Sequence, residues 1–167
     1  SSQSSNSSSS LVSSDFAGNF GEIVAIRGEE TTPTFRAMVE EALTWNVSKL
    51  ALALRELEWH RATVAQLFQQ VDLLLTPTLA TTAFPIDRRP DLIDNLPVDP
   101  YWGFTPFTYP FNMSGNPAAS IPCGFSPEGL PVGLHVVGAL GNETLVLQAS
   151  AAFETERPWV DKHPPEP

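Results

Sequence analysis

The single cysteine and one of the histidines are the side chains best suited to nucleophilic chemistry. Cys123 and His135 lie on two apolar runs that a hairpin would bring together, and a histidine beside a thiol can generate the reactive thiolate. A cysteine inside an apolar run is more often a small buried hydrophobic side chain. We therefore interpret both residues as buried and structural, and expect no catalysis that a Cys123→Ala substitution would abolish.

A serine nucleophile is the second possibility. Such an enzyme needs a hydroxyl beside a base and donors for the developing oxyanion, and the common Gly-x-Ser-x-Gly pattern is absent from this sequence. Ser114 and Ser120 lie outside the serine-rich start of the chain, but neither has a base near it in the sequence. We therefore predict no catalytic residue in this chain.

Metal and cofactor chemistry has no sequence support either. His60, His135 and His163 are far apart, and neither a His-Glu-x-x-His nor a Cys-x-x-Cys pair is present. The aspartates between Asp87 and Asp99 are typical of a solvated loop. Since there is also no glycine-rich phosphate loop, we predict no metal and no cofactor.

The charge balance excludes further classes of function. The chain of 167 residues carries 19 acidic and 9 basic residues, and its net charge of -10 would repel a phosphate backbone. No apolar run approaches the roughly 20 residues that a membrane helix needs. A single cysteine suits a reducing compartment. We therefore expect no nucleic-acid partner, no membrane partner and a cytoplasmic location.

The start of the chain is poor in core-forming residues. Residues 1–14 are almost all serine, a composition that cannot bury enough apolar surface to offset chain entropy, so a flexible tail is predicted. A natural linker, an expression scar and the remnant of a removed segment all fit it. Between Asp15 and Glu30 the short Glu22–Ile26 run indicates one strand, with a loop as the alternative.

Two amphipathic helices are predicted next. Thr32 can cap the first and Pro33 suits its first position. Its apolar residues repeat at three and four: Phe35, Met38, Val39, Ala42 and Leu43. The second helix begins near Ser48 and carries an apolar stripe typical of core packing. The stripe consists of Leu50, Leu54, Leu57, Val64, Phe68 and Val71.

Strands dominate the rest of the pattern. The run Leu73–Leu75 ends at Thr-Pro-Thr and is typical of a strand buried on both faces. Two further runs, Ala118–Phe125 and Leu130–Val137, flank a Ser-Pro-Glu-Gly turn and predict an antiparallel hairpin. In the second run His135 shares a face with Gly133 and Val137. Asn142 can then cap a last helix, which carries Leu145, Ala149, Ala152 and Phe153 and ends at Pro158.

A long proline-rich connection separates the first strand from the hairpin. It ends in a dense aromatic group, and this density argues against disorder. Loops of this length that are ordered are commonly functional. The aromatic residues are Tyr101, Trp102, Phe104, Phe107, Tyr109 and Phe111.

Three linked stretches carry a family resemblance. They are Asp-Leu-Leu-Leu-Thr-Pro-Thr at residues 72–78, Phe-Asn-Met-Ser-Gly-Asn-Pro-Ala-Ala-Ser-Ile-Pro at 111–122, and Gly-Leu-Pro-Val-Gly-Leu-His-Val-Val-Gly at 129–138. In this order and spacing the chain resembles the C-terminal part of the amidase signature family, which hydrolyses amides and some esters. The family usually carries glutamine where this chain has His135 and Asn116.

The resemblance implies an α/β fold in which this chain forms the C-terminal part of a mixed sheet flanked by helices. The domains expected are a tail and linker over residues 1–31, the C-terminal portion of an amidase-like domain over 32–160, and a C-terminal tail over 161–167. The family's catalytic Ser-Ser-Lys arrangement has no counterpart in this sequence. The chain is therefore expected to supply scaffold and pocket wall, and to be inactive without an N-terminal portion.

The resemblance also points to residues that would face a small amide substrate. They lie at the end of the first strand and in the aromatic loop, and core packing is the alternative role for the aromatic members. These candidate substrate-binding residues are Thr78, Trp102, Phe104, Thr105 and Phe107.

Unpaired strand edges imply a partner, which is either the N-terminal amidase portion or a second copy of the chain. A different class of function is also open, in which the chain is a non-catalytic remnant that serves as a binding or interaction module. Ammonia transfer within a tRNA-dependent amidotransferase fits the resemblance as well as simple hydrolysis does.

Overall fold

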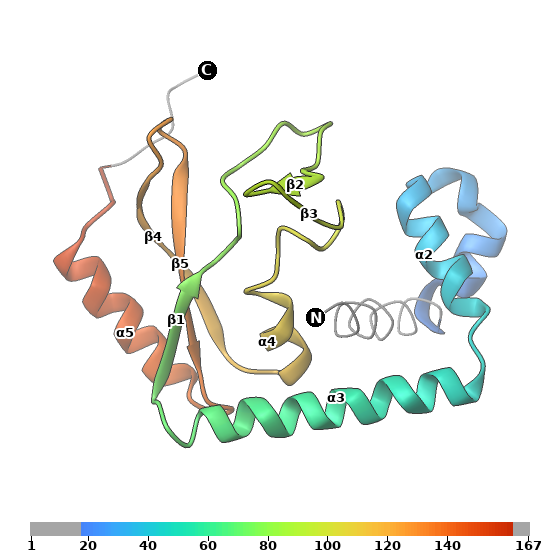
Figure 1. Cartoon of the computed structure of the whole chain (residues 1–167), viewed down its shortest axis with the longest axis horizontal. Helices are drawn as coiled ribbons and strands as arrows, with labels where there is room; N and C mark the ends of the chain where they lie inside the picture. Colours follow the sequence, from blue (N-terminus) through green and yellow to red (C-terminus); the bar gives the residue numbers. More distant parts are fainter. Residues whose placement is uncertain (1–17, 162–167) are drawn as a thin grey trace. The chain divides into compact units, whose positions relative to one another are not determined.

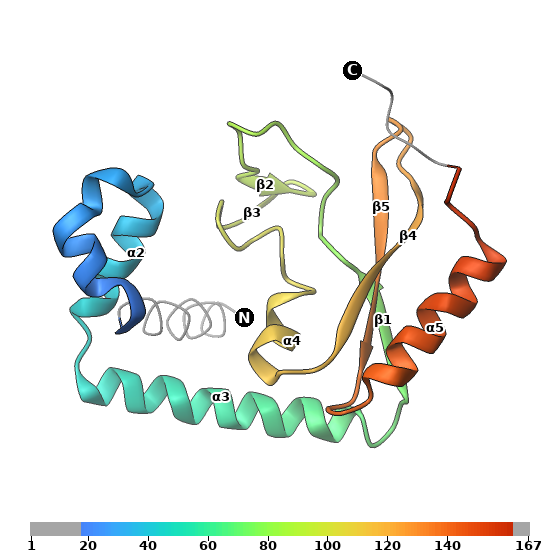
Figure 2. The same ribbon diagram turned by 180° about the vertical axis from the view of Figure 1, so that it is seen from behind.

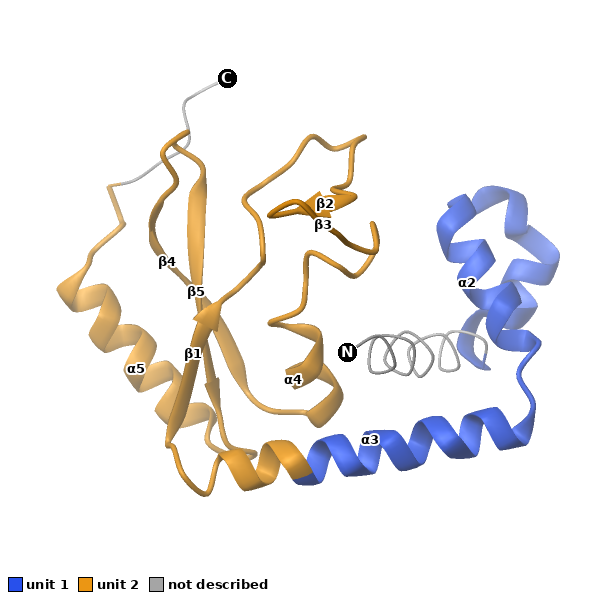
Figure 3. Cartoon of the chain, viewed as in Figure 1, with its two compact units in different colours: residues 1–62 blue, residues 63–167 orange. Residues whose placement is uncertain are grey.

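The computed structural model of the protein describes residues 18–161. The chain divides into two compact units, Ser1–Ala62 and Thr63–Pro167 (Figure 3). The predicted flexible tail over residues 1–14 lies outside the described residues. The division into units falls inside the predicted domain over residues 32–160 and does not test the boundaries of that domain. These boundaries therefore stay a prediction.

The described part of the first unit is helical. Residues 18–27 form a helix, followed by the short η1 (Gly28–Glu30) and by α2 (Pro33–Leu43). The cap predicted at Thr32 is confirmed, because its hydroxyl accepts a hydrogen bond of 3.3 Å from the Phe35 backbone N–H. Val39 and Ala42 are the buried residues of α2.

The strand expected at Glu22–Ile26 is wrong. This run is part of the helix over residues 18–27. Val24 is buried, whereas Ile23 and Ile26 are 49% and 82% exposed. The run contains three β-branched residues, which favour strands, but only Val24 is buried. Strand propensity alone therefore did not predict the structure of this run.

The second predicted helix is confirmed as α3 (Val47–Leu67). The apolar stripe of this helix is not uniformly buried. Leu50 and Leu54 are 37% and 47% exposed, while Val64 is buried. The last two stripe residues, Phe68 and Val71, follow the end of the helix. Although α3 is long, none of the helices in residues 18–161 is apolar enough to cross a membrane.

The second unit contains a three-stranded sheet in the order β1-β5-β4 (Figures 1 and 2). Its strands are β1 (Leu73–Pro77), β4 (Ala118–Phe125) and β5 (Pro131–Gly138). Both pairings are antiparallel, so the described residues form a small antiparallel sheet with helices, and its place in a larger mixed sheet stays a prediction. The α/β class itself is confirmed.

Burial of β1 on both faces was a wrong expectation. Leu75 is 57% exposed, although Leu73 and Leu74 pack against the two cores. The helix α5 (Glu143–Glu156) contacts β4 and β5 and leaves this part of β1 uncovered. β1 is therefore an edge strand that is covered at Leu73 and Leu74 but exposed at Leu75.

The hairpin prediction is confirmed. The Gly129 N–H donates to the Ser126 carbonyl at 2.9 Å, and Gly129 has a φ of 81°, which favours glycine. The predicted alternation along β5 also holds. Val136 packs against Ile121 and α5, while Val137 packs on the opposite face of the sheet.

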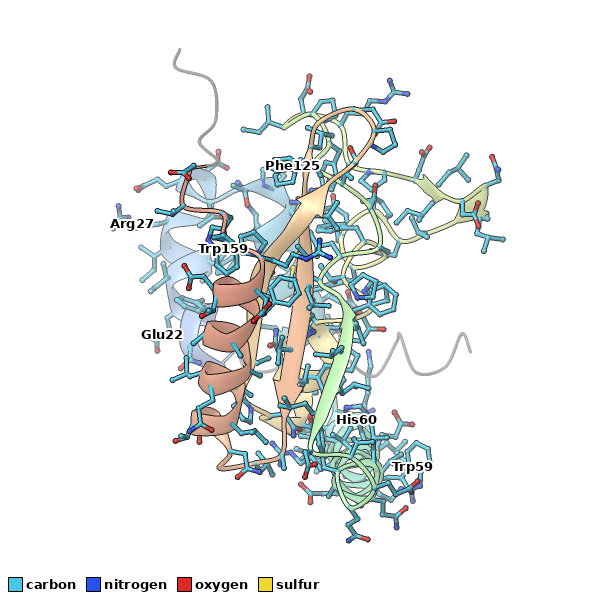
Figure 4. The ribbon with its side chains drawn as sticks, turned by 90° about the vertical axis from the view of Figure 1, so that its left-hand side faces the viewer. Glu22, Arg27, Trp59, His60, Phe125 and Trp159 are labelled. Atoms are coloured by element: carbon cyan, nitrogen blue, oxygen red, sulfur yellow. The ribbon has the colours of Figure 1, made fainter. Side chains whose placement is uncertain are left out.

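The last helix begins and ends as predicted, after Asn142 and before Pro158. The Asn142 side chain makes no capping hydrogen bond, but its backbone carbonyl accepts from the Val146 N–H. Val146 is the buried residue of this helix. Trp159, which lies beyond the end of α5 in Figure 4, packs against the same core.

The long connection is ordered, as its aromatic content predicted. It contains a small hairpin of β2 (Leu92–Ile93) and β3 (Leu96–Pro97), joined by two residues with positive φ, Asp94 and Asn95. Such a pair is typical of a two-residue hairpin turn. The helix α4 (Tyr109–Ser114) then returns the chain to the sheet on the side opposite α5 (Figures 1 and 2).

Candidate functional site

A hollow of about 540 Å³ lies where β1 ends beside the β4–β5 hairpin. One wall is the segment 79–83 that follows β1, and the other consists of residues from β4 and β5. A volume of this size lies within the range of small-molecule sites. The hollow is therefore the candidate binding site of the second unit.

Two hydroxyl groups meet inside this hollow. Thr78 Oγ1 lies 2.7 Å from Ser120 Oγ, and these residues come from directly after β1 and from β4. The Thr78 N–H also donates to the Gly133 carbonyl at 3.0 Å. The sheet thus holds both hydroxyls in fixed positions.

Gly133 makes this arrangement possible. A Cβ atom at Gly133 would lie 2.7 Å from both the Ser120 and the Thr78 hydroxyl oxygen, which is closer than any stable contact. Glycine is therefore required here for the close approach of neighbouring atoms.

The lining of the hollow carries no charge. Its polar side chains are the four hydroxyls of Thr78, Thr81, Thr82 and Ser120, and its other residues are leucine, alanine, proline, valine and glycine. The described lining can therefore donate and accept hydrogen bonds but cannot neutralise a charged ligand.

His135 lies on the same face of the sheet as the two hydroxyls of the hollow, but its side chain is buried. It is opposite Thr76 in one pairing and opposite Ser120 in the other, and its ring centre lies 5.8 Å from that of Phe111. Burial lowers the pKa of His135, and a hydrogen bond to the Phe107 backbone offsets part of this change. A buried neutral imidazole here connects the sheet to the aromatic loop.

Of the five candidate substrate-binding residues, Thr78 lines the hollow. The aromatic-loop residues Trp102, Phe104, Thr105 and Phe107 are half-buried and do not line it. Phe104 nevertheless supports one wall. Its carbonyl accepts from the Ala80 N–H at 3.1 Å, and its ring meets that of Phe84 edge-on at 5.1 Å. A substrate role for these five residues stays a prediction.

The thiol and imidazole are not brought together. The Cys123 thiol lies 3.4 Å from the Val132 carbonyl, and the register places His135 opposite Ser120. His135 is buried as expected, but Cys123 is exposed, so its predicted burial is wrong. The physical reason is the irregularity between Pro122 and Gly124, which interrupts the alternation of the strand.

Ser114 has a structural role. It is buried, and its hydroxyl lies within 3.3 Å of the Phe111 carbonyl and within 2.6 Å of Asn116 Oδ1. Asn116 Nδ2 in turn donates to the Gly138 carbonyl at 2.7 Å. These contacts fix the turn from α4 into β4.

Sequence reasoning missed part of the site. The sequence alone indicates Ser120 only as a candidate nucleophile, and it does not single out the segment 79–83. Counting back from the Ser126–Gly129 turn would place Ser120 opposite Val136. The irregularity between Pro122 and Gly124 shifts the register by one residue, so no sequence signal gave the pairing of Ser120 with His135. Across residues 18–161 no three histidine, cysteine, aspartate or glutamate side chains are grouped to hold a metal ion.

Comparison with known protein families shows that the amidase family model matches residues 2–147. The chain belongs to the amidase signature family. The match extends over both units and includes the end of β1, the hairpin and the beginning of α5.

Two relatives illustrate how much of the family this chain contains. It is 40% identical over 99 residues to a glutamyl-tRNA(Gln) amidotransferase subunit of Cyanothece sp., covering 58% of this chain and 19% of that protein. It is 40% identical over 94 residues to an acylamidase of Rhodococcus erythropolis, covering 56% of this chain and 20% of the acylamidase. The chain thus spans about a fifth of the length of the curated relatives it matches.

Solved structures give the same result for the fold. A bacterial aryl acylamidase of the amidase signature family superimposes with a TM-score of 0.83 at 24% identity, covering 98% of this chain and 37% of that one. The described fold is therefore a part of the amidase signature fold.

Proposed function

We propose that this chain is the C-terminal portion of an amidase-like hydrolase that cleaves the C–N bond of carboxamides. It supplies scaffold and a wall of the substrate pocket, and the Ser-Ser-Lys centre comes from an N-terminal portion. No cofactor or metal is required of this chain. The cytoplasm is its proposed location.

The observation that carries this proposal is a preformed hollow in a chain of amidase sequence. The hollow lies at the end of the Thr-Pro-Thr strand and beside the Gly-Leu-Pro-Val-Gly strand, two of the stretches on which the family resemblance rests. Its size and its hydroxyl groups suit an amide with apolar substituents.

The hydroxyls of this chain do not form a nucleophilic centre by themselves. Ser114 is buried and bonded to backbone and to Asn116, and Ser120 pairs with the hydroxyl of Thr78, which is not a base. Because a serine nucleophile needs a neighbouring base, we expect the isolated chain to be inactive.

Isolation of the protein from its own source tests the proposal. Native mass spectrometry, read beside the denatured intact mass, would show whether a second polypeptide is bound. The complex and the separated chain would each be assayed for aniline release from aryl amides, with Cys123→Ala as the control for thiol-dependent catalysis. We expect activity in the complex, none in the separated chain, and no effect of the control substitution.

A complex that folds but releases no aniline would contradict the proposal. A binding or interaction module is the second candidate, and the exposed apolar side chains of α3 favour it. Val47, Leu52 and Leu54 are 84%, 51% and 47% exposed. A module of this kind would hold a partner without any hydrolysis, so the same assay separates the two.

A further inference from the structure

The hydroxyl pair of Thr78 and Ser120 is the only described cross-strand pair of hydroxyls that lines the hollow. We infer that this pair is the polar anchor for an uncharged amide substrate, and that Gly133 keeps the space open for it. The inference rests on the proposed function and names the substrate class of the same site. It also excludes amides that place a carboxylate or an ammonium group in the hollow.

The hydrogen-bonding capacity of the pair matches an amide. Two hydroxyls carry two hydrogens, and one of them is used between Thr78 Oγ1 and Ser120 Oγ. One hydrogen and several lone pairs remain. An amide presents one carbonyl acceptor and, when not fully substituted, an N–H donor. The remaining hydroxyl hydrogen can donate to the amide carbonyl, and a hydroxyl lone pair can accept from the amide N–H.

The surroundings select against charge. None of the described residues that line the hollow is charged, and its walls are mostly aliphatic. A carboxylate in the hollow would find hydroxyl donors but no cation among the described lining residues to pair with. A neutral amide has a much smaller desolvation cost.

The two hydroxyls differ in access. Ser120 is exposed, while Thr78 is half-buried and held by its backbone bond to Gly133. Ser120 is therefore the more accessible hydroxyl for a ligand, and its contact of 2.7 Å with Thr78 restrains its orientation. A methyl group at Gly133 would lie 2.7 Å from both oxygens and would push the pair apart.

The test measures binding to the full chain and does not depend on catalysis. Backbone amide shifts would be followed by NMR during titration with butyranilide and, separately, with N-phenylsuccinamate, which adds a carboxylate at similar size. We expect butyranilide to shift residues 78–83 and Gly133, and N-phenylsuccinamate to bind at least about tenfold more weakly.

Variants assign the effect to the pair. Ser120→Ala and Thr78→Val each remove one hydroxyl and should weaken butyranilide binding roughly three- to tenfold. Gly133→Ala should weaken it at least as much. Ser150→Ala and Thr155→Val are matched controls, since these hydroxyls bond to the backbone of α5 outside the hollow. The controls should leave the affinity within about twofold.

Three results would overturn the inference: no butyranilide binding at millimolar concentration, equal or tighter binding of the carboxylate, or unchanged affinity in both Ser120→Ala and Thr78→Val. The two single-hydroxyl variants keep the test valid if Gly133→Ala does not fold. Failure of the proposed function is a separate result. If the complex hydrolyses amides but this chain shows no butyranilide binding in the hollow, the inference fails and the proposed function stands. If the chain binds butyranilide but the complex is inactive, the proposed hydrolysis fails and the inference on binding stands.

Discussion

Asn116 Nδ2 donates a hydrogen bond of 2.7 Å to the backbone carbonyl of Gly138, 22 residues further along the chain. The same side chain accepts from the Ser114 hydroxyl. One amide group therefore links the end of α4, the beginning of β4 and the end of β5.

Replacing Asn116 with alanine should lower the free energy of unfolding by about 1–3 kcal/mol, because the Gly138 carbonyl and the buried Ser114 hydroxyl would each lose a partner. Urea titration measures this change. Asn112→Ala, at an exposed position of α4, is the matched control and should change stability by less than about 0.5 kcal/mol. Equal effects of the two substitutions would contradict the role assigned to Asn116.

The buried imidazole of His135 predicts a pH dependence of stability. Its pKa in the folded chain is lowered from the ordinary value of 6.5, mainly by burial. Between that ordinary value and the lowered one, the unfolded chain binds more protons than the folded chain, so stability falls as the pH falls below 6.5. Above this value the contribution of His135 is constant.

His135→Gln, which replaces the imidazole with an amide that does not titrate, removes this titration. Urea titrations from about pH 7.5 to about pH 5 should show a smaller loss of stability for the variant than for the parent chain. Carboxylates protonate in both proteins and cancel in the comparison. Parallel curves would show that protonation of His135 does not oppose folding.

Gly103 is a tightly packed backbone position of the aromatic loop. A Cβ atom there would lie 2.5 Å from Val98 Cβ and 2.6 Å from the Asp99 carbonyl oxygen. Gly103→Ala should therefore force this loop apart, cost about 1–3 kcal/mol and reduce the near-UV circular dichroism of the neighbouring Tyr101 and Trp102. Gly18→Ala, where a Cβ meets no atom within 4 Å, should leave the near-UV spectrum unchanged and should not destabilise the chain. An unchanged near-UV spectrum in Gly103→Ala would refute this account of the loop.

The exposed apolar residues of α3 predict association of the isolated chain. Leu52 and Leu54 are 51% and 47% exposed, and Figure 4 shows Trp59 and His60 on the same helix. Sedimentation velocity should show species larger than a monomer of 18.2 kDa. Glutamate at Leu52 and Leu54 together should shift the population toward monomer, whereas Val160→Glu should not. A monomer at all concentrations would remove this support for a partner.

Local sequence signals were sufficient for much of the fold. Thr32 and Pro33 located the start of α2, and the Ser126–Gly129 turn with alternating residues defined the β4–β5 hairpin. The helix over residues 18–27 was missed at Glu22–Ile26, because this run has high strand propensity and Val24 is its one buried apolar residue. In each successful case, the residues that gave the prediction lie in the same element or turn as the structure that they predicted.

The candidate site was only partly predictable. The family resemblance pointed to Thr78 at the end of the Thr-Pro-Thr stretch, and its substrate role stays a prediction. Its contact with Ser120 joins residues 42 positions apart. No short pattern encodes such a contact. The exposure of Cys123 depends on a strand irregularity that an alternating pattern cannot reveal.

The sheet order has a consequence for how the chain folds. The β4–β5 hairpin closes over a turn of four residues, whereas β1 joins β5 through contacts such as that of Thr76 with His135, separated by 59 positions. Closing the longer loop costs more chain entropy, so the hairpin is expected to form early and β1 to dock late. The wall that carries Thr78 would then be the last part of the hollow to assemble, and a partly folded chain would expose the edge of β5 that β1 later pairs with.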